Sequence, residues 1–167
     1  MIKMILCSDI RGGIGFNNKL LFNIKEDMIF FKETTLNHKV VMGYNTWLSL
    51  PKKPLPNREN YVLYDGEENI EGVTILKNID EVVNLSKKDD IFIIGGAMVY
   101  NALIESDLVD EVYLTMVYDV NHSADTFVDL SNISVRLKYR KLIKELKYFD
   151  RRGHVPVHVY KYYRLSE

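Results

Sequence analysis

Short apolar runs that alternate with helical patterns are the feature that most constrains the fold of this chain. The apolar runs, which are typical of buried strands, are 4–7, 40–42, 61–64, 73–76, 91–94 and 112–117. Helical patterns lie between several of them, at 24–35, 44–50, 80–86 and 97–105. Strands that alternate with helices in this order predict βαβ units, and therefore an α/β fold with a mainly parallel sheet.

The last part of the chain has a different pattern. Residues 136–149 and 154–164 are predicted to form two long strands joined by a turn at Arg151-Arg152-Gly153, which makes an antiparallel hairpin at the sheet edge. The basic side chains of this segment are Lys138, Arg140, Lys141, Lys144 and Lys147. Because the formal net charge of the chain is only -1, we interpret them as a solvated strand face that protects the edge, rather than as a nucleic-acid patch.

Composition and length are those of a single globular domain. The chain has 167 residues, of which 47% are hydrophobic and 27% charged, and no repeat or linker divides it, so we expect one domain over 1–167. The single cysteine, Cys7, excludes an internal disulfide and a cysteine-based zinc site, and no metal is expected. Asp9 and Arg11 interrupt the first apolar run before a signal peptide develops, and no run is long enough to span a membrane. A cytoplasmic location without nucleic-acid or membrane partners is the expectation.

The predicted helix at 24–35 carries a carboxylate, Asp27, within its apolar face. Asn23, followed three residues later by Glu26, resembles a capping box, so the helix is expected to begin just after Asn23. The residues at helical spacing that should face inward are Ile24, Met28, Phe31 and Thr35. Asp27 shares their face, and no basic residue at helical spacing pairs with it. Two interpretations stay open: a hydrated acid near a helix N-terminus, or a buried carboxylate that awaits a ligand.

Two glycine turns each follow a predicted strand and precede a predicted helix. Gly43 follows the strand at 40–42, and the pair Gly95-Gly96 follows the strand at 91–94. Both would bring a helix N-terminus to the same edge of a parallel sheet, where a diphosphate could bind close to the backbone, with the Thr46 hydroxyl as a donor. Neither turn has the usual dinucleotide or P-loop fingerprint, so ordinary turns remain the alternative.

A stiff segment precedes the strand at 61–64. Pro51, Pro54 and Pro56 favour an extended backbone that delivers Arg58 just before this strand. A guanidinium is suited to bind a carboxylate, whereas the alternative is an ordinary surface arginine.

These pieces, in this order and spacing, resemble a bacterial or phage-type dihydrofolate reductase over nearly the whole chain. The residues that carry the resemblance are Ile14-Gly15, Asp27 with Phe31, Met42-Gly43 with Thr46-Trp47, Pro54-Leu55-Pro56 with Arg58, Ile94-Gly95-Gly96 with Tyr100, Thr115, and Asp125-Thr126. The resemblance implies a single-domain α/β fold, with a mostly parallel eight-stranded sheet, a C-terminal antiparallel hairpin and flanking helices. It also implies an oxidoreductase of one-carbon metabolism that reduces 7,8-dihydrofolate to 5,6,7,8-tetrahydrofolate by hydride transfer from a nicotinamide cofactor to C6, with protonation at N5.

The resemblance also assigns roles to residues. The catalytic residues would be Asp27, Thr115, Leu20 and Phe22. Asp27 would bind the 2-amino and N3 edge of the pterin and have a raised pKa, Thr115 would hydrogen-bond to it, and Arg58 would bind the α-carboxylate of the glutamate tail. The implied substrate-binding residues are Ile5, Leu6, Cys7, Asp27, Met28, Phe31, Leu50, Leu55, Arg58, Ile94, Tyr100 and Thr115. Dihydrofolate and antifolates such as methotrexate would be the ligands of a monomeric enzyme.

The implied cofactor is NADPH. Its binding residues would be Cys7, Ile14, Gly15, Asn18, Leu20, Gly43, Tyr44, Asn45, Thr46, Leu63, Tyr64, Asp65, Lys77, Ile94, Gly95, Gly96, Ala97, Met98, Val99, Tyr100 and Thr126. The resemblance further implies a cis Gly95–Gly96 peptide, and a loop at 15–22 that closes over the site and is held by Asp125.

The chain departs from the family pattern at two places. Leu21-Phe22 replaces the usual Pro-Trp, and Phe22 lacks the N–H that helps to hold a water near the pterin. Tyr44, Tyr64 and Asp65 stand where the family usually reads the 2'-phosphate with Arg and Ser, and Met98 replaces a common Arg or Gln. Lys77, which the resemblance places near the same pocket, could still attract the 2'-phosphate. The other departures nevertheless predict a weakened preference for NADPH over NADH.

Two alternatives to the folate reductase remain. One is a pyrimidine reductase of riboflavin synthesis on the same fold, against which Asp27 and Arg58 favour folate. The other is a catalytically idle binding homologue, in which Phe22 and Tyr44 would mark the loss of function.

Overall fold

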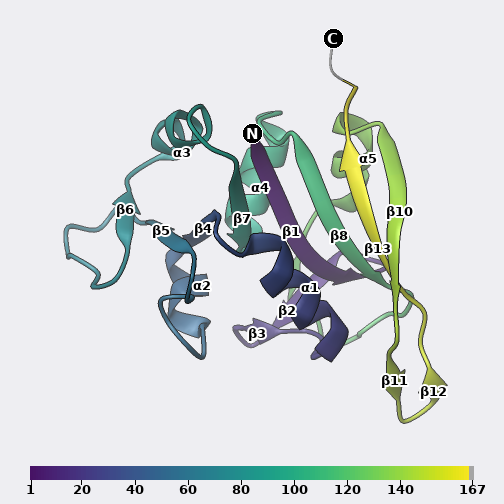
Figure 1. The fold of residues 1–167 in the computed structure, drawn as a ribbon. Coiled ribbons are helices and arrows are strands. Elements are labelled where there is room, and N and C mark those ends of the chain that lie inside the picture. The colour runs from purple at the N-terminus through teal and green to yellow at the C-terminus, as the bar shows by residue number, and fades with distance from the viewer. Residues whose placement is uncertain (166–167) are drawn as a thin grey trace.

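The computed structural model describes residues 1–165, and one large sheet organises them. Its eight strands run in the spatial order β10-β13-β8-β1-β7-β4-β5-β6 (Figure 1). Their bounds in chain order are β1 Ile2–Asp9, β4 Lys39–Gly43, β5 Glu59–Leu63, β6 Thr74–Leu76, β7 Ile91–Gly95, β8 Glu111–Val117, β10 Tyr139–Leu146 and β13 Val157–Tyr163. The strands from β8 to β6 are parallel, whereas β13 is antiparallel to both of its neighbours. The predicted mostly parallel sheet with a C-terminal antiparallel hairpin is confirmed.

Both faces of the sheet are covered, because successive side chains of the central strands alternate between two apolar clusters. Val41 packs on one face with α3 (Ile79–Ser86), α4 (Ala97–Glu105) and α5 (Leu130–Arg136). Its neighbours Val40 and Met42 pack on the other face, with residues of α1 (Lys25–Thr35) and α2 (Tyr44–Ser49). All three strand residues are fully buried, which explains why an unbroken apolar run forms this strand. Figure 1 shows α1 in front of the sheet and α4 and α5 behind it.

Smaller elements extend this frame; the sequence did not predict the first group, whereas the second flanks the predicted turn at Arg151-Arg152-Gly153. Strands β2 (Gly13–Phe16), β3 (Lys19–Leu20) and β9 (Thr126–Phe127) form a three-stranded sheet beside the end of β1. Strands β11 (Phe149–Asp150) and β12 (Gly153–His154) form a separate two-stranded extension. The predicted hairpin strand from residue 136 was too long, because Arg136 is the last residue of α5 and β10 begins at Tyr139.

Two expectations about α1 were wrong. The helix begins at Lys25, and its N-cap, Ile24, makes no side-chain capping bond, so the expected box of Asn23 and Glu26 is absent. The Glu26 carboxylate instead accepts a hydrogen bond of 2.7 Å from the backbone N–H of Lys147. This acceptor is therefore used by a segment distant in sequence and not by the start of the helix. Met28 does not face inward but is 55% exposed, whereas Ile24 and Thr35 are buried as expected.

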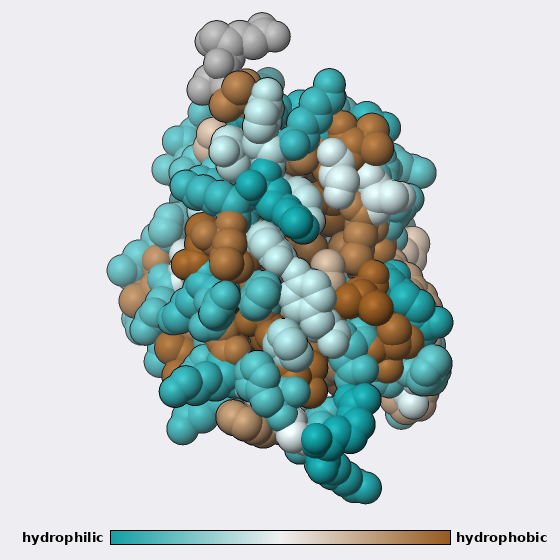
Figure 2. Space-filling view, turned by 90° about the vertical axis from the view of Figure 1, so that its right-hand side faces the viewer, coloured by the Kyte–Doolittle hydropathy of each residue, from teal (hydrophilic) through white to brown (hydrophobic). Residues whose placement is uncertain are grey.

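The hairpin edge is solvated, as the sequence suggested. Residues 139–145 of β10 are all exposed, and Figure 2 shows brown apolar groups interspersed with teal hydrophilic ones on this side of the molecule. Within residues 1–165, no helix is both long and apolar enough to cross a membrane, and no cluster of His, Cys, Asp and Glu is arranged to hold a metal ion.

Candidate active site

Asp27 lies over the centre of the sheet, where β1 and β8 run side by side. Cys7 and Thr115 are direct partners in the parallel register of these strands, so both side chains point to the face that α1 covers. Thr115 Oγ1 donates a hydrogen bond of 2.6 Å to Asp27 Oδ1, which confirms the contact expected between them. No ion pair within residues 1–165 involves Asp27.

The electrostatics of this carboxylate are dominated by its burial. Burial raises the pKa of Asp27 above its usual value, and the hydrogen bonds from Thr115 and Cys7 oppose that rise only in part. Burial also raises the pKa of the Cys7 thiol well above its usual range, so a neutral sulfur lies beside the carboxylate. A desolvated acid without a cation is a group that can bind a ligand rich in N–H donors. The structure therefore favours the second of the two interpretations of Asp27.

Most of the apolar residues expected around the substrate gather on the Asp27 face. Ile5 is buried there, and the partly buried residues packed in the same cluster include Phe31, Leu50, Leu55 and Ile94. Three of the expected substrate-binding residues, Leu6, Met28 and Tyr100, do not join them. Leu6 alternates to the opposite face of the sheet, where it packs in the cluster that contains Tyr100, and Met28 is exposed at the rim. The Tyr100 hydroxyl donates to Ile5 O at 2.8 Å, which links α4 to β1 beneath the site.

Arg58 is anchored to the same helix that carries Asp27. Its Nε donates to Pro56 O at 2.9 Å, and its terminal nitrogen donates to Thr35 Oγ1 at 3.2 Å. Thr35 follows Asp27 by eight residues, which corresponds to about 12 Å along the helix axis. The Asn60 side chain bonds the backbone of the intervening loop at Leu55 and Arg58, so the loop conformation is fixed. A carboxylate and a guanidinium thus stand at the two ends of one half-buried helix face.

The residues expected to hold the cofactor converge at one edge of the sheet. They lie at the carboxyl ends of four neighbouring parallel strands, β7, β4, β5 and β6, and in the adjoining small sheet. Those after β4 are Gly43, Tyr44, Asn45 and Thr46; those at the end of β7 and after it are Ile94, Gly95, Gly96, Ala97, Met98, Val99 and Tyr100; those at the ends of β5 and β6 are Leu63, Tyr64, Asp65 and Lys77; and those in or beside the small sheet are Ile14, Gly15, Asn18, Leu20 and Thr126.

The two glycine turns are adjacent, as the sequence predicted. Met42 of β4 pairs with Gly95 of β7, and the Gly95–Gly96 peptide is cis, as expected. A Cβ atom on Gly95 would lie 2.8 Å from Thr46 Oγ1, and one on Gly96 would lie 3.2 Å from the same oxygen. Only glycine therefore lets the Thr46 hydroxyl lie directly against this turn. The arrangement leaves backbone groups and one hydroxyl close together at the starts of α2 and α4.

The far end of this edge is aromatic and acidic. The rings of Tyr44 and Tyr64 stack with centroids 4.5 Å apart. The Tyr64 hydroxyl bonds Glu68, which raises the pKa of Tyr64 to about 12, and the Lys77 ammonium bonds Gly66 O. Met98 points away from protein contacts, with 86% of its surface exposed.

The segment 15–22 is attached to the main body by Asp125. The Asp125 carboxylate accepts a hydrogen bond from the backbone N–H of Asn17 at 2.9 Å, and the backbone N–H of Asp125 donates to Gly15 O at 3.0 Å. The expected attachment is therefore confirmed. Leu20 lies in this segment with 79% of its surface exposed, whereas Phe22 packs against the buried cluster that includes Ile24.

One buried acid was missed by the sequence analysis. Asp9, at the end of β1, is fully buried and accepts backbone N–H groups of Arg11, Gly13 and Asn121. Aspartate side chains in turns commonly accept the backbone N–H two residues on, as Asp9 accepts that of Arg11, so an aspartate at a strand end just before a Gly-Gly turn was the available signal.

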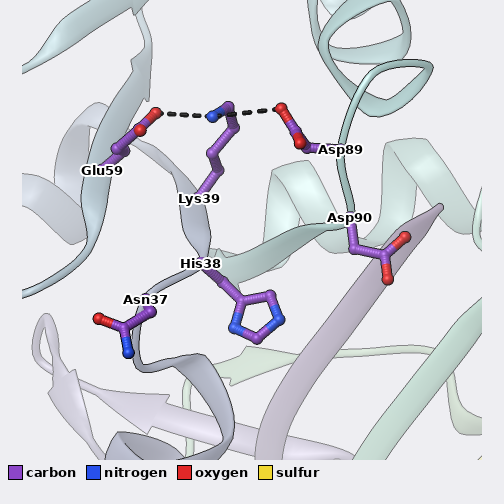
Figure 3. Close-up of a pocket in the computed structure, with 6 residues that line it drawn as sticks. All are labelled: Asn37, His38, Lys39, Glu59, Asp89 and Asp90. Carbon is purple, nitrogen blue, oxygen red and sulfur yellow. Dashed lines mark hydrogen bonds and ion pairs between the residues drawn. The ribbon is translucent and has the colours of Figure 1, made fainter.

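A separate polar depression of about 270 Å³ lies at the opposite, amino end of the strands. It is lined by Asn37, His38, Lys39, Glu59, Asp89 and Asp90 (Figure 3). Figure 3 shows the Lys39 ammonium between two carboxylates, at 2.7 Å from Glu59 and 3.3 Å from Asp89. Because its cation is already paired and its lining is mostly exposed, this depression is not our candidate for the active site.

Comparison with known proteins agrees with the site. The family model described as dihydrofolate reductase matches residues 1–164. The dihydrofolate reductase of Ureaplasma parvum is 42% identical over 106 residues, covering 62% of this chain and 68% of that protein. That of Staphylococcus aureus is 34% identical over 127 residues, covering 75% and 76%. A solved dihydrofolate reductase from Enterococcus faecalis, complexed with NADP(H) and RAB-propyl, is 27% identical with a TM-score of 0.79 and covers 99% of this chain and 97% of its own.

The class of protein that the fold and the site define is a nicotinamide-dependent α/β reductase. Within that class, the chain belongs to the dihydrofolate reductase family. The resemblance in the motifs is thereby confirmed, and with it the activity of the family, the reduction of dihydrofolate.

Proposed function

We propose that the Asp27 pocket binds 7,8-dihydrofolate, that the carboxyl edge of β7, β4, β5 and β6 binds NADPH, and that the protein forms tetrahydrofolate there. The observation that carries this assignment is the lone carboxylate of Asp27, desolvated and hydrogen-bonded to Thr115. It stands on the same helix face as the anchor of Arg58. A ligand with N–H donors at one end and a carboxylate at the other matches both groups.

Asp27 binds and orients the substrate. Its two oxygens accept the parallel N–H donors of the 2-amino and N3 edge of the pterin, and Thr115 holds the carboxylate in place. Because burial raises its pKa, Asp27 also stores a proton at a higher pH than an exposed aspartate. The substrate is protonated at N5 more readily while that proton is present, so we expect turnover to fall as pH rises through the pKa of Asp27.

Arg58 binds the far end of the substrate. The guanidinium takes the α-carboxylate of the glutamate tail in a charge-assisted contact, while Thr35 and Pro56 keep its direction fixed. The apolar cluster with Ile5 and Phe31 lies between the two polar anchors and keeps water from the pocket.

The strand-end residues fit a dinucleotide. The close contact of Gly95 and Gly96 with Thr46 leaves a small cradle that a Cβ atom would fill, which suits backbone approach to a pyrophosphate. When bound, NADPH supplies the hydride. The neighbouring Enterococcus structure, which is complexed with NADP(H), supports this choice of cofactor.

The test is the loss of NADPH absorbance when dihydrofolate is added to the purified protein. We expect turnover that methotrexate inhibits stoichiometrically, and sedimentation as a single-domain monomer. Oxidation of NADPH that requires a phosphorylated ribosylamino pyrimidine in place of dihydrofolate would overturn the assignment, and so would a protein that binds methotrexate without turnover.

A further inference from the structure

Asp9 is a buried acid that the proposed chemistry does not use. Its side chain has no exposed surface, and its two oxygens accept three backbone N–H groups. Oδ1 accepts from Arg11 at 2.9 Å and from Gly13 at 2.8 Å, and Oδ2 accepts from Asn121 at 2.9 Å. A buried carboxylate is tolerated only when such donors satisfy it, so each of these bonds is expected to be strong.

The three donors belong to two segments that are far apart in the sequence. Arg11 lies between β1 and β2, and Gly13 is the first residue of β2, whereas Asn121 lies between β8 and β9. A backbone bond from Ile10 N to Asp119 O, at 3.1 Å, joins the same two segments, and Val128 N, just after β9, bonds Gly12 O at 2.9 Å. The carboxylate therefore sits at a junction of the end of β1 with both segments.

This junction connects directly to the proposed active site. Gly13 is the first residue of β2, whose continuation through 15–22 leads into α1, the helix of Asp27. The segment after Asn121 carries Asp125, which accepts the N–H of Asn17 in that same continuation. The stretch 13–22 is thus held at its start, Gly13, and near its middle, Asn17, by segments that the Asp9 carboxylate fixes relative to each other.

We propose that Asp9 is a positioning residue for the reductase: through its three backbone bonds it sets how the stretch 13–22 lies against the bound cofactor and substrate. The inference rests on the proposed function. A substitution that loosens the junction should slow hydride transfer and speed the release of the cofactor. The Asp27 pocket itself should change little, because its contacts with Thr115 and Cys7 come from other strand positions.

The substitution Asp9→Asn tests this with little change in size. Its amide keeps one acceptor oxygen but turns an N–H₂ group toward the N–H of Asn121, so the link to that segment is lost. A matched control is Asp110→Asn at the other end of β1, where Asp110 Oδ2 accepts the N–H of Ile2 at 2.8 Å. Both variants convert a carboxylate that caps β1 into an amide, but only Asp9 contacts the active-site segments.

Single-turnover kinetics with NADPH and dihydrofolate are the first measurement. We expect Asp9→Asn to slow hydride transfer about tenfold, the scale of one lost hydrogen bond to a charged group, with the dissociation constant of methotrexate unchanged within about threefold. Asp110→Asn should leave the rate unchanged. A hydride-transfer rate of Asp9→Asn within twofold of the unaltered protein, or equal losses in both variants, would overturn the proposal.

Amide hydrogen exchange separates positioning from general destabilisation. In Asp9→Asn the exchange should accelerate in residues 10–22 and 118–125 but not in β7 or β4, and uniform acceleration would contradict the proposal. If this variant does not fold, hydrogen exchange of the unaltered protein provides the test. Binding of NADPH should slow the exchange of the Gly13 and Asn121 amides together, and exchange rates that change independently at these two amides would contradict the proposal. An unaltered protein that does not oxidise NADPH with dihydrofolate refutes the proposed function instead.

Discussion

The two ends of the parallel strands both gather charged side chains, yet only one end has the character of an active site. At the amino end, Lys3 lies 3.2 Å from Asp90 and 3.4 Å from Glu111, and Lys161 lies 2.8 Å from Glu111. Lys39 adds two further pairs with Glu59 and Asp89. Each of these lysines is paired with at least one carboxylate, so the charges at the amino end of the strands neutralise one another.

At the carboxyl half, Asp27 has a hydroxyl partner and no cation within the described chain. The consequence appears in the direction of the pKa shifts. Burial raises the pKa of Asp27, whereas at Asp90 the same desolvation is outweighed by the N-terminal ammonium and Lys3, and the pKa is lowered. The comparison teaches that a buried carboxylate without a cationic partner marks the candidate active site better than the density of charged residues or the volume of a depression does.

The largest expected effect comes from removing the unpaired charge. Asp27→Asn should lower turnover at neutral pH by about a thousandfold, because it loses a charge-assisted contact and the stored proton together. The pH dependence should change as well. The unaltered enzyme should slow as pH rises through the raised pKa of Asp27, and the variant should lack that step. Steady-state rates from pH 5 to pH 8 measure both, with NADPH affinity as the control. Unaltered turnover across this range would show that the carboxylate is not the catalytic group.

The next effect concerns the second polar anchor. Arg58→Leu should weaken dihydrofolate binding by about 2–4 kcal/mol, since the α-carboxylate loses its charged partner. A pterin substrate without the glutamate tail is the matched control and should bind as before. Because Arg58 also bonds Thr35 and Pro56, equal losses for both substrates would assign it a structural role instead.

A smaller effect is expected at the cofactor edge, where charge is again unbalanced. Stacked Tyr44 and Tyr64 cannot pair a phosphate dianion, exposed Asp65 would repel a 2'-phosphate bound beside it, and Lys77 is engaged with Gly66 O. We predict that kcat/KM for NADH lies within about tenfold of that for NADPH, or about 1.4 kcal/mol of discrimination. The double substitution Tyr44→Arg with Asp65→Ser should widen the ratio. A ratio of hundreds in favour of NADPH in the unaltered protein would reject the idea.

The sequence predicted those parts of the molecule that depend on periodicity or on short motifs. Buried runs such as 40–42 became strands because burial on both faces requires an unbroken apolar run. Helix α5 was missed because it is short: its cap, Asp129, bonds the N–H of Asn132, and of the helix residues only Ile133 is fully buried. A seven-residue helix provides too few repeats for its period to be recognised.

The sequence-based predictions that were wrong or incomplete near the site have a common cause: the contacts of these residues depend on partners that are distant in sequence. Glu26 caps no helix because the N–H of Lys147 takes its carboxylate. Met28 has helical spacing appropriate to the buried face, but the spacing does not tell where the helix crosses the rim of the sheet. The role of Asp9 depends on Asn121, which is 112 residues away.

The last and smallest prediction concerns stability at the two ends. Burial raises the pKa of Asp27 in the folded protein above its value in the unfolded chain, so ionisation costs stability there. The cost is absent below the unfolded pKa of about 3.9 and grows as pH rises through the folded pKa. Asp27→Asn should therefore be more stable than the unaltered protein at pH 7, by about 1 kcal/mol, with the gain vanishing toward pH 3.

The matched variant at the amino end is Lys39→Met, which should change stability in the opposite direction and by less. It removes the partner of two largely exposed carboxylates, Glu59 and Asp89, and solvent replaces most of what is lost. Its turnover should equal that of the unaltered enzyme. Urea denaturation at pH 3, 5 and 7 measures both variants by the same method. If Asp27→Asn were less stable than the unaltered protein at pH 7, or if its gain did not fade with acid, the carboxylate would be a structural group with hidden partners, and the contrast between the two ends would fail.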